Sequence, residues 1–212
     1  MNKEKHYILM ADVKDSRRKK GNKLMNDLKS VVNETSVDYK SSFVSPITIT
    51  LGDEFQSIVK SLSEGLDIVF NMEEYRIHNQ IDFELRYVIY QGEIDTAINT
   101  TVAHEMVGEG LTNARETLQG LKKKNQNYYI YLDNQTKSKY LNQLFFLYHS
   151  EVSGWHKKDY EVIGYFLAGK DYRQIAKIIN RDASSVWRKE RTLKMKEYFT
   201  LKELIKTLAY EF

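Results

Sequence analysis

Stretches of alternating or continuous apolar residues predict five β-strands in the first two thirds of the chain. These stretches are rich in β-branched and aromatic residues, and a Gly52-Asp53 turn signal separates two of them. The predicted strands cover residues 6–13, 43–51, 54–59, 81–93 and 128–132. The second and third strands, on either side of the turn, are therefore expected to form a hairpin.

Apolar residues at helical spacing predict helices between these strands. The predicted helices cover residues 23–37, 62–78, 111–121 and 140–148. The first six elements follow the order β-α-β-β-α-β, which is typical of a largely antiparallel sheet covered by helices. The predicted fold class is therefore α+β, with a ferredoxin-like sheet and covering helices.

The last third of the chain reads as a small all-α unit. An apolar helical stripe ends at Gly169, and a second helix is expected over residues 172–179. Asp182 is suited to cap a third helix, so two short helices meet across a three-residue turn. This is the pattern of a helix-turn-helix. The chain is predicted to divide into an α/β domain, residues 1–152, and a helix-turn-helix domain, residues 153–212.

One face of the third predicted helix carries groups that suit DNA. Successive residues of a helix are about 100° apart, so the face opposite the buried Val186 can be identified. That face and its margin carry hydroxyl and guanidinium groups, those of Ser184, Ser185, Arg188 and Arg191. Such groups contact phosphates and base edges. The alternative is that the three helices only pack on the first domain or dimerise.

Charge is distributed unevenly between the two predicted parts. Residues 155–212 contain thirteen Lys and Arg against eight Asp and Glu, a net charge of +5. The rest of the chain has nineteen against twenty-one, a net charge of −2. A polyanion such as DNA would therefore bind the C-terminal part.

Composition excludes several classes of protein. The chain has no cysteine, which excludes disulfides, thiolate metal sites and cysteine nucleophiles. Hydrophobic residues make up 42%, well above the composition of a disordered chain. The sequence has no signal-peptide core and no apolar run of membrane-spanning length. We expect a cytoplasmic protein.

Two aspartates mark a candidate metal site in the first part. Asp12 ends the first strand and Asp53 lies in the hairpin, so both are expected at the same end of the sheet. Two carboxylates there can hold Mg²⁺ together with the phosphates of a nucleotide. Ser16, Arg17 and the helix N-terminus that follows them are suited to those phosphates. Alternatively, Asp12 caps the next helix and Asp53 only makes its turn.

This arrangement resembles the class III nucleotidyl cyclase fold. The resemblance rests on the element order, on Asp12, on the Gly52-Asp53 hairpin and on a strand that ends in Gly92-Glu93. In that family two aspartates bind the catalytic metals, which by resemblance are Asp12 and Asp53. The combination with Ser16, Arg17 and a C-terminal helix-turn-helix is most similar to the SatD family of bacterial proteins.

The C-terminal segment resembles the helix-turn-helix of sigma-factor region four and of response-regulator effector domains. About forty residues carry this resemblance, most clearly Ala168-Gly169, Gln174-Ile175-Ala176 and Ser184-Ser185-Val186. Cyclase-like domains pair head to tail, so the first part implies a homodimer. Together the resemblances imply a dimer with two DNA-contacting units.

Several positions depart from the cyclase pattern. Ile49 or Thr50 stands where that family has its base-selecting lysine, and Thr112 and Glu116 replace its transition-state asparagine and arginine. We therefore expect a cytoplasmic DNA-binding regulatory protein whose first domain serves as a nucleotide or Mg²⁺ sensor or as a dimerisation scaffold. The alternative is a metal-dependent nucleotidyl cyclase or nucleotidyltransferase.

Overall fold

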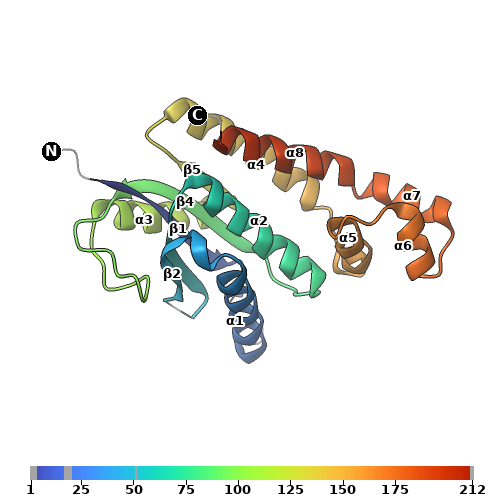
Figure 1. The fold of residues 1–212 in the computed structure, drawn as a ribbon, viewed down its shortest axis with the longest axis horizontal. Coiled ribbons are helices and arrows are strands. Elements are labelled where there is room, and N and C mark those ends of the chain that lie inside the picture. The colour runs from blue at the N-terminus through green and yellow to red at the C-terminus, as the bar shows by residue number, and fades with distance from the viewer. Residues whose placement is uncertain (1–3, 17–20, 51, 211–212) are drawn as a thin grey trace.

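A five-stranded sheet forms the centre of the protein (Figure 1). The computed structural model describes residues 4–16, 21–50 and 52–210. The strands are β1 (Lys5–Val13), β2 (Phe43–Ile49), β3 (Glu54–Val59), β4 (Leu85–Glu93) and β5 (Tyr128–Tyr131). Their order across the sheet is β2-β3-β1-β4-β5. All neighbours pair antiparallel except β4 and β5, which are parallel.

Strand β1 lies in the middle of the sheet because both of its faces are apolar. Its last six residues are all buried, and β3 and β4 pair with it on either side. Leu9 and Ala11 point into the larger core on one face, whereas Ile8 and Met10 point into a smaller core on the other. A strand buried on both faces in this way needs helices on both sides.

Helices cover both faces. On the larger core lie α1 (Gly21–Asp38), α2 (Leu62–His78) and α4 (Gln135–Val152), and α3 (Glu109–Lys124) covers the other face. The first six elements form the predicted β-α-β-β-α-β unit, so the α+β class is confirmed. Within the described ranges, no helix is both long enough and apolar enough to cross a membrane.

The outer edge of β5 is closed by side chains of α4. The Asn142 side chain accepts a hydrogen bond from the Ile130 amide at 2.9 Å and donates one to its carbonyl at 2.8 Å. The Ser138 hydroxyl donates to the same carbonyl at 2.6 Å. These bonds satisfy backbone groups that a further strand would otherwise use.

The last third contains four helices rather than three. They are α5 (Tyr160–Leu167), α6 (Tyr172–Ile178), α7 (Ala183–Thr192) and α8 (Met195–Tyr210). The sequence analysis did not anticipate α8, which runs back along α4 and α2 (Figure 1). The Lys137 ammonium donates to the Ala209 carbonyl at one end, and the Tyr148 ring contacts the Tyr198 ring at the other, so α4 and α8 are antiparallel.

The described core continues from the sheet into α8, because α4 and α2 contribute to both. The Tyr198 ring lies 4.9 Å from that of Trp155 and 5.6 Å from that of Tyr148, centre to centre. Its hydroxyl donates to the Glu74 carboxylate at 2.6 Å. The division of the chain at residue 152 stays a prediction, and any fragment that ends there would leave this surface of α4 and α2 uncovered.

Among the predicted elements, two differ most in their limits from the structure. The strand expected over residues 81–93 begins only at Leu85, because its partner β1 ends at Val13 directly opposite. The helix expected over residues 140–148 extends to Gln135–Val152, since the Asn134 side chain caps its start by accepting from the Lys137 amide. In both cases the limit is set by a contact that apolar periodicity does not report.

We predict that Tyr198→Ala lowers the free energy of unfolding by about 3–5 kcal/mol, as for other buried aromatic truncations. Tyr198→Phe, which loses only the hydrogen bond, should cost about 1 kcal/mol. Denaturant titration followed by circular dichroism measures both. Phe199→Ala is the matched control, because Phe199 is the next residue and is 41% exposed. Equal losses at residues 198 and 199 would contradict the proposed anchoring of α8.

Candidate functional site

Three charged side chains form a row across one end of the sheet. Asp12 of β1 lies opposite Glu54 of β3 and opposite Arg86 of β4. Directly opposite residues of antiparallel strands project from the same face, which here is the face that α3 covers. Helix α3 adds the cations Arg115 and Lys122, so the site combines residues from four elements.

Asp12 is paired with two cations. Arg86 holds the carboxylate from one side, with Nε at 2.8 Å from Oδ1 and Nη2 at 3.1 Å from Oδ2. The Lys122 Nζ lies 2.6 Å from Oδ2. Asp12 is only 1% exposed, so its charge depends on these partners. Sequence reasoning found Asp12 but not Arg86 or Lys122, because strand register and the placement of α3 bring them to it.

Glu54 is the second buried carboxylate of the row. Arg115 Nε lies 3.4 Å from its Oε1, an ion pair without a hydrogen bond to that oxygen among the described residues. Burial raises the pKa of Glu54, and the positive charge of Arg115 opposes this shift. Glu54 thus has an unsatisfied oxygen that faces a half-exposed cation.

The other residues that the sequence predicts for this site follow Asp12 or precede Glu54 closely in the chain. The Asp53 carbonyl accepts from the Val13 amide at 2.9 Å, which brings Asp53 to the same end as Asp12, and its side chain is half-buried. Ser16 is half-buried in the turn after β1. Arg17 lies outside the described residues.

As arranged, the carboxylates do not fit a Mg²⁺ ion. Arg86 and Lys122 take both oxygens of Asp12, and metal ions require oxygens that are free to coordinate. Over the described ranges, no group of three or more His, Cys, Asp or Glu side chains converges as metal ligands do. Lys122 is half-exposed, so it is the partner that would have to leave for Asp12 to bind a metal.

A groove of about 650 Å³ opens beside Glu54, between α3 and the β2-β3 side of the sheet. Its volume is in the range of small-molecule sites, about 300–1,000 Å³. Thr112, Arg115 and Glu116 line it from α3, and Gln56 lines it from β3. Thr112 and Glu116, the residues that depart from the cyclase pattern, therefore both face this groove.

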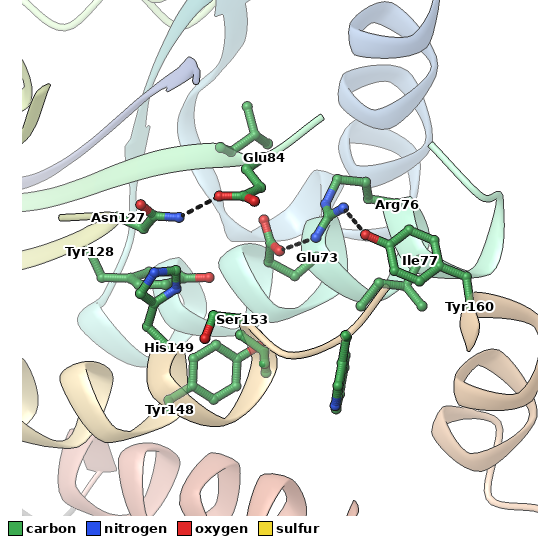
Figure 2. Close-up of a pocket in the computed structure, with 13 residues that line it drawn as sticks. Glu73, Arg76, Ile77, Glu84, Asn127, Tyr128, Tyr148, His149, Ser153 and Tyr160 are labelled. Carbon is green, nitrogen blue, oxygen red and sulfur yellow. Dashed lines mark hydrogen bonds and ion pairs between the residues drawn. The ribbon is translucent and has the colours of Figure 1, made fainter. Parts of the chain in front are cut away.

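A second polar cluster is buried where α2, α4 and α5 meet (Figure 2). Arg76 donates to the Glu73 carboxylate and to the Tyr160 hydroxyl, each at 3.0 Å. The Tyr87 hydroxyl donates to the other oxygen of Glu73 at 2.9 Å. Although burial lowers the pKa of Arg76, Glu73 and Tyr160 hold it above its usual value.

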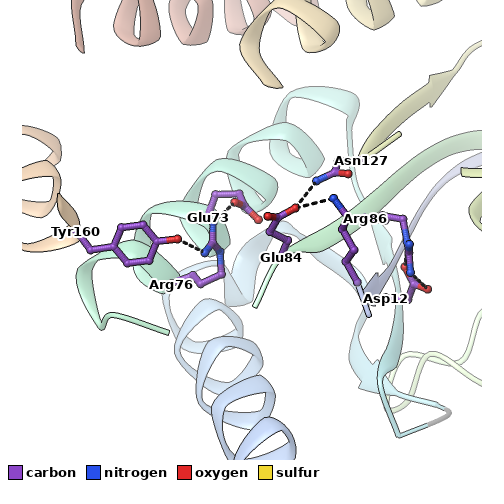
Figure 3. Close-up of polar contacts among 8 residues, drawn as sticks. Asp12, Glu73, Arg76, Glu84, Arg86, Asn127 and Tyr160 are labelled. Atoms are coloured by element: carbon purple, nitrogen blue, oxygen red, sulfur yellow. Dashed lines mark hydrogen bonds and ion pairs between the residues drawn. The ribbon is translucent and has the colours of Figure 1, made fainter. Parts of the chain in front are cut away.

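The small cavity of this second cluster indicates a structural role. Its cavity of about 40 Å³ has room for water but not for a nucleotide. Figure 3 shows Glu84 and Asn127 between the Asp12–Arg86 pair and the Glu73–Arg76–Tyr160 group. The Asn127 amide donates to Glu84 at 3.3 Å. We therefore regard the cluster as the connection between the sheet and α5.

The residues predicted to contact DNA all lie exposed on α7. Val186 and Leu193 are 3% and 4% exposed and hold one side of the helix in the core. The exposed residues include Ser184, Ser185, Arg188 and Arg191. Arg191 stacks over the Trp187 ring at 5.0 Å from its centre, and Trp187 is itself 42% exposed. The sequence therefore predicts the exposed face of α7 correctly.

The turn between α6 and α7 is fixed by capping. Asn180 has a φ of 51°, the left-handed conformation in which asparagine is one of the better tolerated residues. The Asp182 carboxylate accepts from the backbone amides of Ser184 and Ser185, and Ser184 Oγ also donates to it. These bonds lower the pKa of Asp182, the Ser184 hydroxyl contributing most.

Comparisons with known proteins give one family match and several similar solved structures. The sequence model described as the SatD family matches residues 7–209. No curated protein matches the chain. Similar solved structures include a bacterial light-regulated adenylyl cyclase, with 10% identity and a TM-score of 0.42. That match covers 60% of this chain and 43% of the cyclase, so this chain spans less than half of its length.

Two guanylyl cyclases are also similar. The catalytic core of a rhodopsin-guanylyl cyclase with converted specificity is 15% identical with a TM-score of 0.36, and the match covers 55% of this chain and 72% of that one. The guanylyl cyclase domain of the RhoGC fusion protein from the aquatic fungus Blastocladiella emersonii is 11% identical with a TM-score of 0.31. Its match covers 55% of this chain and 75% of that domain.

The two aspartates should respond differently to amide substitution. We predict that Asp12→Asn lowers the free energy of unfolding by about 3–5 kcal/mol, because it leaves the buried Arg86 charge without its carboxylate. Asp53→Asn should change it by no more than about 0.5 kcal/mol, since Asp53 makes no ion pair with the residues that the structure describes. Urea denaturation at neutral pH measures both. Equal stability of the two variants would show that the Asp12 ion pairs do not support the fold.

Proposed function

The chain belongs to the SatD family, and we propose that it is a DNA-binding regulatory protein that contacts DNA through α7. The proposal rests on the exposed face of that helix. Arg188 and Arg191 project from it, and within the part of the chain that the structure describes neither makes an ion pair with a carboxylate. Two unpaired guanidinium groups on one short helix are what phosphates and guanine edges require.

The contact should centre on the second half of α7. Asp182 stays charged at the start of the helix, so a phosphate is repelled there, although helix N-termini usually favour anions. The Ser184 hydroxyl is already engaged with Asp182, whereas Ser185 is free to contact DNA through its own. Arg188 and Arg191 therefore provide most of the expected affinity.

Contacts with the first part of the chain fix the position of the proposed DNA-contacting helices. Arg76 of α2 holds Tyr160 at the start of α5, and Lys189 of α7 pairs with Asp159 just before it. In the proposed function the first part thus acts as a body that positions α7. Its homodimerisation would give two such helices, the arrangement with which dimeric helix-turn-helix proteins bind two half-sites.

We predict that Arg188→Ala with Arg191→Ala weakens DNA binding at least tenfold and reduces the dependence of log affinity on log salt by about two, one for each lost contact. Fluorescence anisotropy with a duplex of mixed sequence at two or more salt concentrations measures both quantities.

The matched control removes the same charge elsewhere. Lys123 and Lys124 are exposed at the end of α3, so Lys123→Ala with Lys124→Ala changes net charge equally without touching α7. Arg188→Lys with Arg191→Lys keeps the charge but loses bidentate geometry. If the α3 variant weakens binding as much as the α7 variant, the effect is one of net charge and the proposed face is wrong.

A second candidate function is nucleotide binding in the groove beside Glu54. Its support is Arg115, which lines the groove and faces the buried unsatisfied oxygen of Glu54. Lys122 adds a second half-exposed cation on the same helix. Phosphates would be attracted by those cations. Thr112 and Glu116 offer no positive charge to a transition state, so we expect binding without turnover.

Thermal shift with Mg²⁺ and ATP or GTP tests this second candidate, because a ligand of the native state raises its melting temperature. We expect a rise for the wild type and none for Asp53→Asn, with chromatography showing unchanged triphosphate. A shift with nucleotide alone would assign binding to the cations rather than to a metal. Absence of any shift would leave the domain as a scaffold, and cyclic or linear products would identify an enzyme.

A further inference from the structure

An apolar groove runs along the outer side of the α4 and α8 pair, away from the sheet. We call it the α4/α8 groove, and its volume is about 440 Å³. It is lined by Tyr140, Gln143, Leu144, Leu147, Leu204, Thr207 and Leu208. Tyr140, Leu147 and Leu204 are 52%, 50% and 48% exposed, so large apolar side chains stand at its rims. Such a concentration on two adjacent helices is typical of an interaction surface.

Among the residues that the structure describes, those that line the groove include no charged side chain. Gln143 and Thr207 provide its polar groups, and both are neutral. In contrast, the side of α8 that faces α2 carries Lys202 and Lys206, which pair with Glu74 and Asp67. The two sides of α8 therefore differ in kind: one is held to the body by ion pairs, and the other is apolar and open.

We infer that the α4/α8 groove is where a second copy of this chain docks. In a two-fold contact the same patch meets itself, so a charge near the axis faces its own like charge. A neutral, apolar patch avoids that repulsion, whereas a partner that is selected by charge would require the opposite. The rims also suit self-pairing, because the side chains of Leu147 and Leu204 of one copy can insert into the groove of the other.

Size sets the expected strength of this contact. A helix of 16 residues is about 24 Å long, and two helices side by side are about 20 Å wide. A face of that size is smaller than the ~800 Å² per partner of a standard interface. We therefore expect a dimer that dissociates in the micromolar range.

This contact would also pair the DNA-contacting helices, although the inference does not rest on DNA binding. Helix α7 ends at Thr192 and α8 begins at Met195, so a short connection joins α7 to α8. Docking through α4 and α8 would place two copies of α7 in one particle. The surface differs from the groove beside Glu54, where a cyclase-like pairing would be sought.

Sedimentation velocity without DNA tests the inference, at concentrations from about 1 to about 300 µM, which bracket a weak interface. We expect the wild type to shift from monomer to dimer over this range. Leu147→Glu and Leu204→Glu should each weaken the association at least tenfold. Phe146→Glu is the control, because Phe146 is 71% exposed on α4 but does not line the groove. Circular dichroism verifies that all three variants are folded.

The absence of cysteine from the chain permits a second, independent readout. Single cysteines at Gln143, Leu204 and Thr207 test proximity to the two-fold axis, because a disulfide forms only when the two Cα atoms lie within about 7 Å. At least one should cross-link on oxidation, whereas Phe146→Cys should not.

Three results would overturn the inference. They are a wild type that remains monomeric over the whole concentration range, a dimer that both groove variants leave intact, and cross-linking no better in the groove than at Phe146. Because none of these measurements contains DNA, their failure leaves the test of α7 unaffected.

Discussion

A buried guanidinium needs compensating partners, and this requirement determines how the C-terminal helices meet the sheet. Arg76 of α2 is 6% exposed, so its charge must be matched inside the protein. Glu73 supplies the negative charge from the same helix, and Tyr160 supplies an oxygen from α5. Since α6 and α7 follow α5 in the chain, this group contributes to the position of the proposed DNA-contacting helix, together with the Lys189–Asp159 ion pair.

Periodicity predicts the elements well where burial alone decides them. The third strand, Glu54–Val59, and the second helix, Leu62–His78, have the limits that the sequence predicts. Helix α8 was missed although it buries Met195, Tyr198, Ile205 and Ala209. Its partners on α2 and α4 are distant in the chain, including Glu74 for Tyr198, and no local signal reports them.

The candidate sites also differ in how far the sequence predicts them. The exposed face of α7 could be predicted, because one buried residue, Val186, fixes the orientation of the helix. The pairing of Asp12 could not, since Arg86 is 74 residues away and reaches it only through the register of β1 and β4. The sequence alone does not distinguish a strand-end carboxylate that binds a metal from one that pairs with an arginine. In the structure, Asp12 pairs with Arg86.

The closed edge of β5 limits how copies of this protein can assemble. Asn142 and Ser138 occupy the backbone groups of Ile130 that an incoming strand would need. Growth by edge-to-edge strand pairing, the usual route to fibrils, is therefore blocked on that side. An assembly that uses a helical surface instead, if it is two-fold, closes after two copies and leaves no free patch for a third. Even at high concentration, such a protein would saturate as a small particle rather than polymerise.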